Sequence, residues 1–143
     1  MQAIPRPKGR ILCTEDDADS RELLVHILEA ADYHVTVTAD SADALSLAQS
    51  NPFDLILVDS WMPGLSGQEL TTEIRKFNKS TPILFYSGAA YESDKILARD
   101  AGAQGYLTKP EGILDLVAEV ARLISEARIA FPVAVDLPQS ATS

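Results

Sequence analysis

The stretch Asp54-Leu-Ile-Leu-Val-Asp59 decides the fold. Its continuous apolar run is typical of a strand that is buried on both faces of a sheet. A carboxylate directly after such a strand is costly to bury unless it is paired or coordinates a cation. We therefore expect a central strand that ends in a chemically used Asp59. The alternative from local sequence alone is a cap or turn residue before Ser60.

Apolar runs alternate with amphipathic stretches on both sides of this strand. Further strands are predicted at residues 10–14, 34–38, 82–87 and 105–108. A helix is expected after each strand, the fourth over about 92–101 and the last over about 111–128. Five strands that alternate with five helices predict an α/β fold, with a doubly wound parallel sheet and helices on both faces.

Local patterns predict how two of these helices start and which side three of them bury. Asp17 or Asp19 is expected to cap the first helix, and Ser41 the second. The spacing of the apolar residues predicts that the following side chains face the core: Leu23, Leu24, Ile27, Leu28 and Ala31 in the first helix, Leu70, Ile74 and Phe77 in the third, and Ile113, Leu116, Val117, Val120, Leu123 and Ile124 in the last.

Length and composition suit one domain. The 143 residues are 46% hydrophobic, and we expect an N-terminal extension at 1–8, a domain at 9–128 and a tail at 129–143. The net charge of −9 disfavours nucleic acid as a partner. No apolar run is long enough to cross a membrane or to serve as a secretory signal. The single cysteine favours a reducing, cytoplasmic location.

Polar side chains follow four of the five predicted strands. They are Glu15 and Asp16 after the first strand, Asp59 after the third, Ser87 at the end of the fourth and Lys109 after the fifth. Ligands of doubly wound sheets bind outside the carboxyl ends of the strands. This convergence is the main indication of a functional site.

Each of these side chains has a chemical and a structural interpretation. Three carboxylates at one edge repel one another unless a cation joins them, and hard oxygen ligands suit Mg²⁺. Alternatively, Glu15 and Asp16 only open a helix, where acids suit the dipole. Lys109 can pair with a carboxylate or a phosphoryl oxygen, and Ser87 can donate to such an oxygen. Taken singly, a loop lysine is usually solvated and a serine before glycine usually forms a turn.

The motifs together resemble a known family. Five segments closely resemble the receiver domains of two-component response regulators over about residues 9–128. These segments are Ile11-Leu-Cys-Thr-Glu-Asp16, Asp54-Leu-Ile-Leu-Val-Asp59, Met62-Pro63-Gly64 with Gly67, Ser87-Gly88 and Tyr106-Leu-Thr-Lys-Pro110. Each motif alone is weak or moderate evidence, whereas their order and spacing are specific. The resemblance implies the flavodoxin-like strand order 2-1-3-4-5.

The resemblance also implies a role for each residue of the site. Asp59 matches the phosphoacceptor, which takes a phosphoryl group from a phosphohistidine of a sensor histidine kinase or a histidine phosphotransfer protein. Mg²⁺ is expected on Glu15, Asp16, Asp59 and the carbonyl of Trp61. Lys109 and Ser87 match the lysine and hydroxyl residue of the catalytic set, and Tyr106 matches the aromatic switch residue. Such a domain is not an enzyme in the usual sense, although it catalyses its own phosphorylation and dephosphorylation.

Three positions depart from the family pattern. Thr14 stands where an apolar residue is usual, which a strand end tolerates. Trp61 stands two residues after Asp59, at a position that tunes hydrolysis in the family, and Ala89 stands two residues after Ser87. Neither side chain can orient an attacking water, so a long-lived phosphoaspartate is expected. The alternative for Trp61 is simple shielding of the loop.

Partners are expected to bind the surface of this domain, because no output domain is expected. Many relatives bind their partners through the fourth helix, fifth strand and fifth helix. The corresponding region here, about Glu92 to Arg128, is expected to bind a downstream protein that the sequence does not identify. The last helix also carries Leu114, Ala118 and Ala121 beside its core stripe. These residues are expected either to serve a homodimer or another partner, or to make core contacts. The segment from Phe131 to Val135 is expected to dock either on this domain or on a neighbour, and the sequence leaves both open.

Three other functions share parts of this pattern. A haloacid-dehalogenase-type hydrolase also uses an aspartate nucleophile, Mg²⁺ and a lysine, but it needs an acid where Trp61 stands. A flavin or nucleotide module would carry a glycine-rich phosphate loop after a strand, and none is found. A phosphorylation-independent adaptor would be expected to have lost part of the acidic and basic set.

Overall fold

The computed structural model describes residues 7–132 of the chain. Its strands are β1 (Gly9–Thr14), β2 (Tyr33–Thr38), β3 (Leu55–Val58), β4 (Ile83–Ser87) and β5 (Gly105–Thr108). Its helices are α1 (Ala18–Ala30), α2 (Ser41–Ser50), α3 (Gly67–Arg75), α4 (Glu92–Ala101) and α5 (Leu116–Ala130), with a 3₁₀ helix η1 (Glu111–Asp115) before α5. The strands pair in parallel in the order β2-β1-β3-β4-β5. The predicted doubly wound sheet and its flavodoxin-like order are confirmed.

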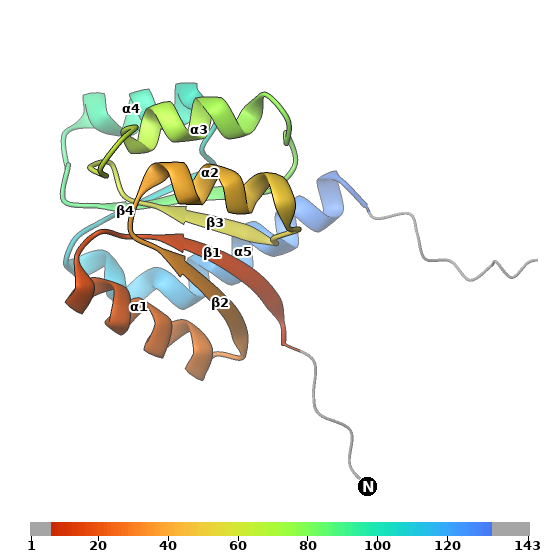
Figure 1. The fold of residues 1–143 in the computed structure, drawn as a ribbon. Coiled ribbons are helices and arrows are strands. Elements are labelled where there is room, and N and C mark those ends of the chain that lie inside the picture. Colours follow the sequence, from red (N-terminus) through yellow and green to blue (C-terminus); the bar gives the residue numbers. More distant parts are fainter. Residues whose placement is uncertain (1–6, 133–143) are drawn as a thin grey trace, which may run out of the picture.

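Helices cover both faces of the sheet (Figure 1). Helices α1 and α5 pack on one face, and α2, α3 and α4 pack on the other. Successive residues of β3 point alternately into the two cores, Leu55 and Leu57 into the first and Ile56 and Val58 into the second. All four are at most 1% exposed. Burial on both sides explains why this strand is apolar without alternation.

The start of α2 differs from the prediction. Asp40, not Ser41, caps the helix, because its carboxylate accepts a hydrogen bond from the backbone N–H of Asp43 at 2.9 Å. The hydroxyl of Ser41 is buried and holds the loop after β3 instead. It donates to the carbonyl of Pro63 at 2.9 Å and accepts from the N–H of Leu65. Of the two acids expected as the cap of α1, Asp17 and Asp19, Asp17 is the cap.

Three residues predicted to face the core are exposed. Leu23 is 50% exposed, Phe77 42% and Val117 37%. Leu23 and Val117 lie at the margins of their apolar stripes, beside the buried Leu24 and Leu116. Phe77 lies beyond the end of α3 at Arg75, where the helical spacing no longer applies. Apolar periodicity therefore overestimated the width of the buried stripes.

The last helix also differs from its expected bounds. A single helix over 111–128 was predicted, but η1 precedes α5, and α5 continues to Ala130. A 3₁₀ turn at the start of a helix is common. Ile129 and Ala130, the first residues of the expected tail, are therefore helical. Residues 133–135 of the expected docking segment Phe131–Val135 lie outside the described residues. Residues 1–6 of the N-terminal extension lie outside them as well.

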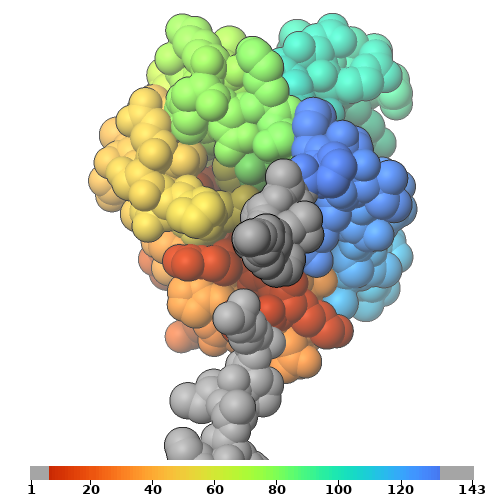
Figure 2. Space-filling view, turned by 90° about the vertical axis from the view of Figure 1, so that its right-hand side faces the viewer, coloured from red at the N-terminus to blue at the C-terminus, as the bar shows by residue number. Residues whose placement is uncertain are grey.

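The amino ends of the strands form the edge opposite the expected site. Figure 2 views this edge, where the start of β1 lies beside the end of α5. Asp54 accepts hydrogen bonds here from the N–H of Arg10 at 2.7 Å and from Arg128 at 3.4 Å. The first acid of the quoted stretch thus serves the structure, because it ties β3 to β1 and α5. None of the helices within residues 7–132 is both long enough and apolar enough to span a membrane.

Candidate functional site

The carboxyl ends of β1, β3 and β5 bring four charged side chains together. Carboxylate oxygens of Glu15, Asp16 and Asp59 all lie within 4.8 Å of one another. The ammonium group of Lys109 donates to Oε1 of Glu15 at 2.8 Å and to Oδ2 of Asp59 at 2.9 Å. These four residues, here called the acidic cluster with its lysine, lie where the sequence predicts them.

Burial sets the electrostatics of this cluster. Glu15 is 2% exposed and Asp59 5% exposed, whereas Asp16 is exposed. Burial raises the pKa of Glu15 above its ordinary value, although the hydrogen bond from Lys109 opposes this. For Lys109, burial alone would lower the pKa, but hydrogen bonds to Glu15 and Asp59 outweigh it and raise the pKa. The lysine is therefore held as a cation beside two buried carboxylates.

The backbone around the cluster fixes both buried acids. The N–H of Trp61 donates to Oδ1 of Asp59 at 3.3 Å, so each oxygen of this carboxylate has a donor. The N–H of Asp17 donates to Oε2 of Glu15 at 3.2 Å. Fixed donors orient the carboxylates without the entropy cost of further side chains. The cluster is thus largely preorganised.

The donor set fits a divalent cation. Three carboxylates facing one ammonium group leave two unbalanced negative charges. Carboxylate oxygens are the ligands that Mg²⁺ prefers, usually together with several waters. Exposed Asp16 lies on an open groove of about 360 Å³, which is also lined by Ser60, Trp61 and Glu69. A hydrated ion therefore has a route to the cluster.

Ser87 lies beside the cluster but outside its hydrogen bonds. The side chain is fully buried at the end of β4, and Oγ accepts from the N–H of Ala89 at 3.1 Å. Among the described residues, Ser87 makes no side-chain hydrogen bond to Asp59 or Lys109. Its carbonyl accepts from the N–H of Lys109 at 2.8 Å, which joins the ends of β4 and β5. The Lys109–Pro110 peptide, whose isomer the sequence left open, is cis.

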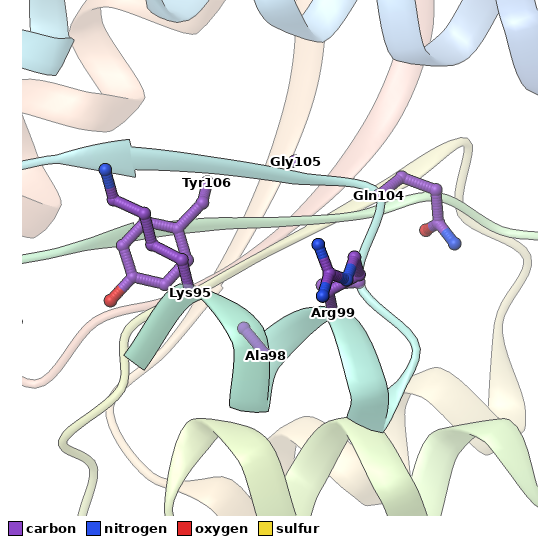
Figure 3. Close-up of a pocket in the computed structure, with 7 residues that line it drawn as sticks. Lys95, Ala98, Arg99, Gln104, Gly105 and Tyr106 are labelled. Atoms are coloured by element: carbon purple, nitrogen blue, oxygen red, sulfur yellow. The ribbon is translucent and has the colours of Figure 1, made fainter. Parts of the chain in front are cut away.

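Tyr106 is a residue of β5, and its side chain lies on the side of the sheet that α4 covers. Its ring stacks on Phe85, with ring centroids 5.6 Å apart, and its hydroxyl donates to the carbonyl of Ala89 at 2.5 Å. Figure 3 shows the ring beside Lys95, with the phenol oxygen directed toward the carboxyl end of the strand. The ring borders a cavity of about 200 Å³ that Lys95 and Ala98 also line. The predicted switch residue thus contacts the loop that follows Ser87.

Trp61 spans two loops at the mouth of the site. The side chain is 65% exposed, and its ring carbon Cζ3 lies 3.7 Å from where a Cβ on Gly88 would stand. The indole therefore connects the loop after β3 with the loop after β4. The carbonyl of Trp61 as a metal ligand stays a prediction.

Several contributors were missed from the sequence. Arg21 on α1 donates to the carbonyls of Glu15 at 2.9 Å and Asp16 at 3.3 Å, and so holds the acidic loop. Thr14, noted only as a departure, donates its buried hydroxyl to the carbonyl of Leu57 at 3.0 Å. Ser60 is buried and lies near the Tyr106 hydroxyl. Nothing in the sequence distinguishes Arg21 from other helix residues. Ser60 carries a signal, because a polar residue directly after the apolar strand and Asp59 is a candidate for a role in the site.

Gly67 has a steric role at the site. A Cβ at this position would stand 2.3 Å from the backbone oxygen of Asp59 and 2.9 Å from Phe85 and Val58. Only glycine allows the start of α3 to approach the end of β3 this closely. The glycine of the sequence motif thus fixes the loop that carries Asp59.

Known proteins similar to this chain include a receiver protein that the match covers almost completely. CpdR of Brucella abortus (strain 2308), a response regulator receiver protein, is 38% identical over 121 residues, which cover 82% of this chain and 98% of CpdR. YkoG of Bacillus subtilis (strain 168), an uncharacterized transcriptional regulatory protein, is 34% identical over 79% of this chain and 50% of its own length. The chain spans about half the length of most of the curated relatives compared.

Solved structures show the same fold. The receiver domain of the Francisella response regulator 1452 is 31% identical with a TM-score of 0.79, covering 83% of this chain and 98% of that domain. The receiver domain of the sensor histidine kinase PA1611 from Pseudomonas aeruginosa PAO1, which has a magnesium ion coordinated in its active site cleft, is 30% identical with a TM-score of 0.76 and covers 82% of this chain and 98% of that domain. The family model of the response regulator receiver domain matches residues 11–121, which include all members of the acidic cluster. The chain therefore belongs to the response regulator receiver domain family of two-component systems.

Proposed function

We propose that Asp59 accepts a phosphoryl group from a phosphohistidine on a sensor histidine kinase or a histidine phosphotransfer protein. The observation that supports this best is the setting of its carboxylate. It is nearly buried, it receives Lys109 at 2.9 Å, and it lies within 4.8 Å of two further acids. Receiver domains belong to signalling proteins rather than to ordinary enzymes, and a cytoplasmic location is part of the same proposal.

The transfer requires positioning and charge more than covalent help. A carboxylate oxygen of Asp59 attacks phosphorus, and the P–N bond of the donor breaks as the imidazole leaves with its electron pair. Lys109 is positioned to neutralise a phosphoryl oxygen, because its ammonium already contacts the attacking side chain. The N–H of Trp61 keeps the carboxylate oriented during attack.

Mg²⁺ is the proposed cofactor. Glu15, Asp16, Asp59 and the carbonyl of Trp61 would hold it, and the bound ion supplies positive charge to the phosphoryl oxygens. The acidic cluster has the charge and the ligand type for this ion. The magnesium ion in the active site cleft of the PA1611 receiver domain supports the proposal by similarity.

Phosphorylation would act through the loops around Asp59. The phosphorylated aspartate carries roughly −1.5 to −2 charge and three acceptor oxygens where a carboxylate with one negative charge stood. The Ser87 hydroxyl, now bound by Ala89, is expected to turn toward these oxygens. Because the Tyr106 hydroxyl donates a hydrogen bond to the Ala89 carbonyl, a shift of the loop after Ser87 moves the ring. The surface from Glu92 to Arg128 would then change its affinity for a downstream protein or a second copy of the chain.

The hydrolase alternative is not favoured by the geometry. The residue two positions after Asp59 is Trp61, whose indole is 65% exposed beside Gly88 and carries no acid to protonate a leaving group. An adaptor without phosphorylation is disfavoured as well, because Glu15, Asp16, Asp59 and Lys109 are all present and lie together at one edge of the sheet.

Acetyl phosphate with Mg²⁺ tests the proposed function. Intact mass spectrometry should show one phosphoryl adduct on the wild type and none on Asp59→Asn, because the amide is a poor nucleophile. Asp43→Asn is the matched control, since Asp43 is an exposed aspartate on α2, and it should keep the adduct. An adduct on Asp59→Asn, or none on the wild type, would contradict the proposal. Turnover of p-nitrophenyl phosphate would favour the hydrolase instead.

A further inference from the structure

Ser60 is a buried polar residue directly after Asp59. The residue is only 3% exposed, and its hydroxyl lies 3.4 Å from the hydroxyl of Tyr106. Among the described residues this is the only hydrogen-bond partner of the Ser60 hydroxyl. A buried hydroxyl without a partner is costly, so this contact has energetic weight despite its length.

The direction of the hydrogen bonds follows from the proton count. The Tyr106 hydroxyl has a single hydrogen, and it is donated to the carbonyl of Ala89 at 2.5 Å, which can only accept. Ser60 is therefore the donor to Tyr106. A chain of two hydrogen bonds runs from the loop after β3, through the tyrosine of β5, to the loop after β4.

The tyrosine ring has room to leave this position. It borders the cavity of about 200 Å³ beside α4, where Lys95 lies next to it (Figure 3). One face of the ring is held by stacking on Phe85. Rotation into the cavity would break both hydroxyl contacts, so Ser60 and Ala89 together determine how often the ring stays in place.

We propose that Ser60 is a positioning residue that couples Tyr106 to the loop of Asp59. The hydroxyl of Ser60 makes the ring respond to the loop that carries the phosphoacceptor, in addition to the loop that follows Ser87. This extends the proposed function, because the first of these loops carries Asp59, whose phosphorylation is the proposed event. Without the Ser60 hydroxyl, the ring follows the Ala89 carbonyl alone.

Fluorine NMR of protein labelled with 3-fluorotyrosine tests the link. The chain has four tyrosines, and the Tyr106 signal is identified by its absence from Tyr106→Phe. The two ring positions are the hydrogen-bonded one and the one rotated into the cavity beside α4. In the unphosphorylated protein, Ser60→Ala should shift their ratio roughly fivefold toward the rotated position, the effect of one hydrogen bond. Ser60→Thr keeps the hydroxyl and should restore most of the wild-type ratio. Ser46→Ala, at an exposed serine of α2, should leave the signal unchanged.

A double-mutant cycle separates this role from simple packing. In urea unfolding, Ser60→Ala should lower the folding equilibrium constant several-fold in the wild type. In a Tyr106→Phe background it should cost no stability and should tend to add some, because the Ser60 hydroxyl there is buried without its partner. Equal losses in both backgrounds, or a Tyr106 signal that ignores Ser60→Ala, would overturn the proposal.

The two proposals fail separately. After addition of acetyl phosphate and Mg²⁺, intact mass gives the fraction of each protein that carries an adduct. At equal fractions, the Tyr106 signal should shift at least about twofold less in Ser60→Ala than in the wild type. Absence of any adduct on the wild type counts against the role of Asp59, while the ring positions of the unphosphorylated proteins still test the Ser60 contact. An adduct with equal Tyr106 shifts counts against Ser60 alone.

Discussion

Burial gives individual residues of the site their chemical character. Glu15 and Lys109 contact each other, yet burial raises the pKa of the acid and acts to lower that of the base. Their mutual hydrogen bond of 2.8 Å, with that to Asp59, keeps the lysine charged. A charge removed from such a cluster leaves its partners buried and unpaired, which costs more than a surface pair contributes.

Cys13 lies in β1, two residues before Glu15. It is expected to make the stability of the fold depend on pH in the alkaline range. Burial is the main cause that raises the pKa of its thiol from 9.0 to about 12. Above pH 9 the unfolded chain loses this proton while the folded protein keeps it. The free energy of unfolding should therefore fall as pH rises above 9, by up to about 1.4 kcal/mol per pH unit.

Urea unfolding at neutral pH and at about pH 10 measures this effect. Cys13→Ala should lose stability through its cavity at both pH values but should lack the added alkaline decline. A decline of the same size in wild type and Cys13→Ala would show that another group is responsible.

At the scale of elements, the loops at the carboxyl edge carry the chemistry and the strands fix where these loops start. The loop between β3 and α3 is an example, since Ser66 caps α3 with a capping box and Gly67 packs against the Asp59 backbone. A loop held at both ends positions Asp59, Ser60 and Trp61 with little freedom.

Trp61 in this loop is expected to slow loss of the phosphoryl group. Its indole covers the approach between the loops after β3 and β4, and neither Trp61 nor Ala89 can orient a water. Trp61→Asn should speed hydrolysis of the phosphorylated protein by roughly tenfold or more, because a polar side chain can position the attacking water.

The adduct is followed by intact mass after acetyl phosphate is removed, with Mg²⁺ kept in the buffer. Phe77→Asn replaces another exposed aromatic residue, 42% exposed and at the end of α3, and should leave the decay unchanged. If the wild type loses its adduct as fast as Trp61→Asn does, the shielding role is wrong.

At the scale of the whole molecule, the sheet holds repelling charges together. The apolar cores on its two faces fix the strands, and their carboxyl ends then bring three carboxylates within 4.8 Å. Mg²⁺ should raise the free energy of unfolding, since a ligand that binds only the folded state stabilises it by RT ln(1 + [L]/Kd). The gain should be about 1.4 kcal/mol for each tenfold excess of Mg²⁺ over Kd.

Asp16→Asn tests the link between the cluster and stability. Without Mg²⁺ it should be as stable as the wild type or more stable, because one repelling charge is removed, and with Mg²⁺ it should gain little. Asp19→Asn, at an exposed aspartate of α1, should respond to Mg²⁺ like the wild type. Urea midpoints across a Mg²⁺ series give the comparison, and equal gains for Asp16→Asn and wild type would exclude Asp16 from the ion site.

Local sequence was sufficient for the strands and for most of the site. The apolar run before Asp59, the alternation of strands and helices and the polar residues at strand ends all follow from short stretches of chain. Because parallel strands place their carboxyl ends at one edge, Glu15, Asp59 and Lys109 were correctly expected to meet. Helix caps and stripe widths were less well predicted, as Ser41 and Leu23 show.

The sequence by itself determined the doubly wound fold, the family and the residues of the acidic cluster, because periodicity and residue type are local properties. Only the tertiary structure decided that Arg21 holds the acidic loop and that Ser60 donates to Tyr106. The first contact depends on which way a helix side chain turns back toward a strand end. The second joins residues 46 positions apart and depends on sheet register and crossovers, which no local pattern encodes.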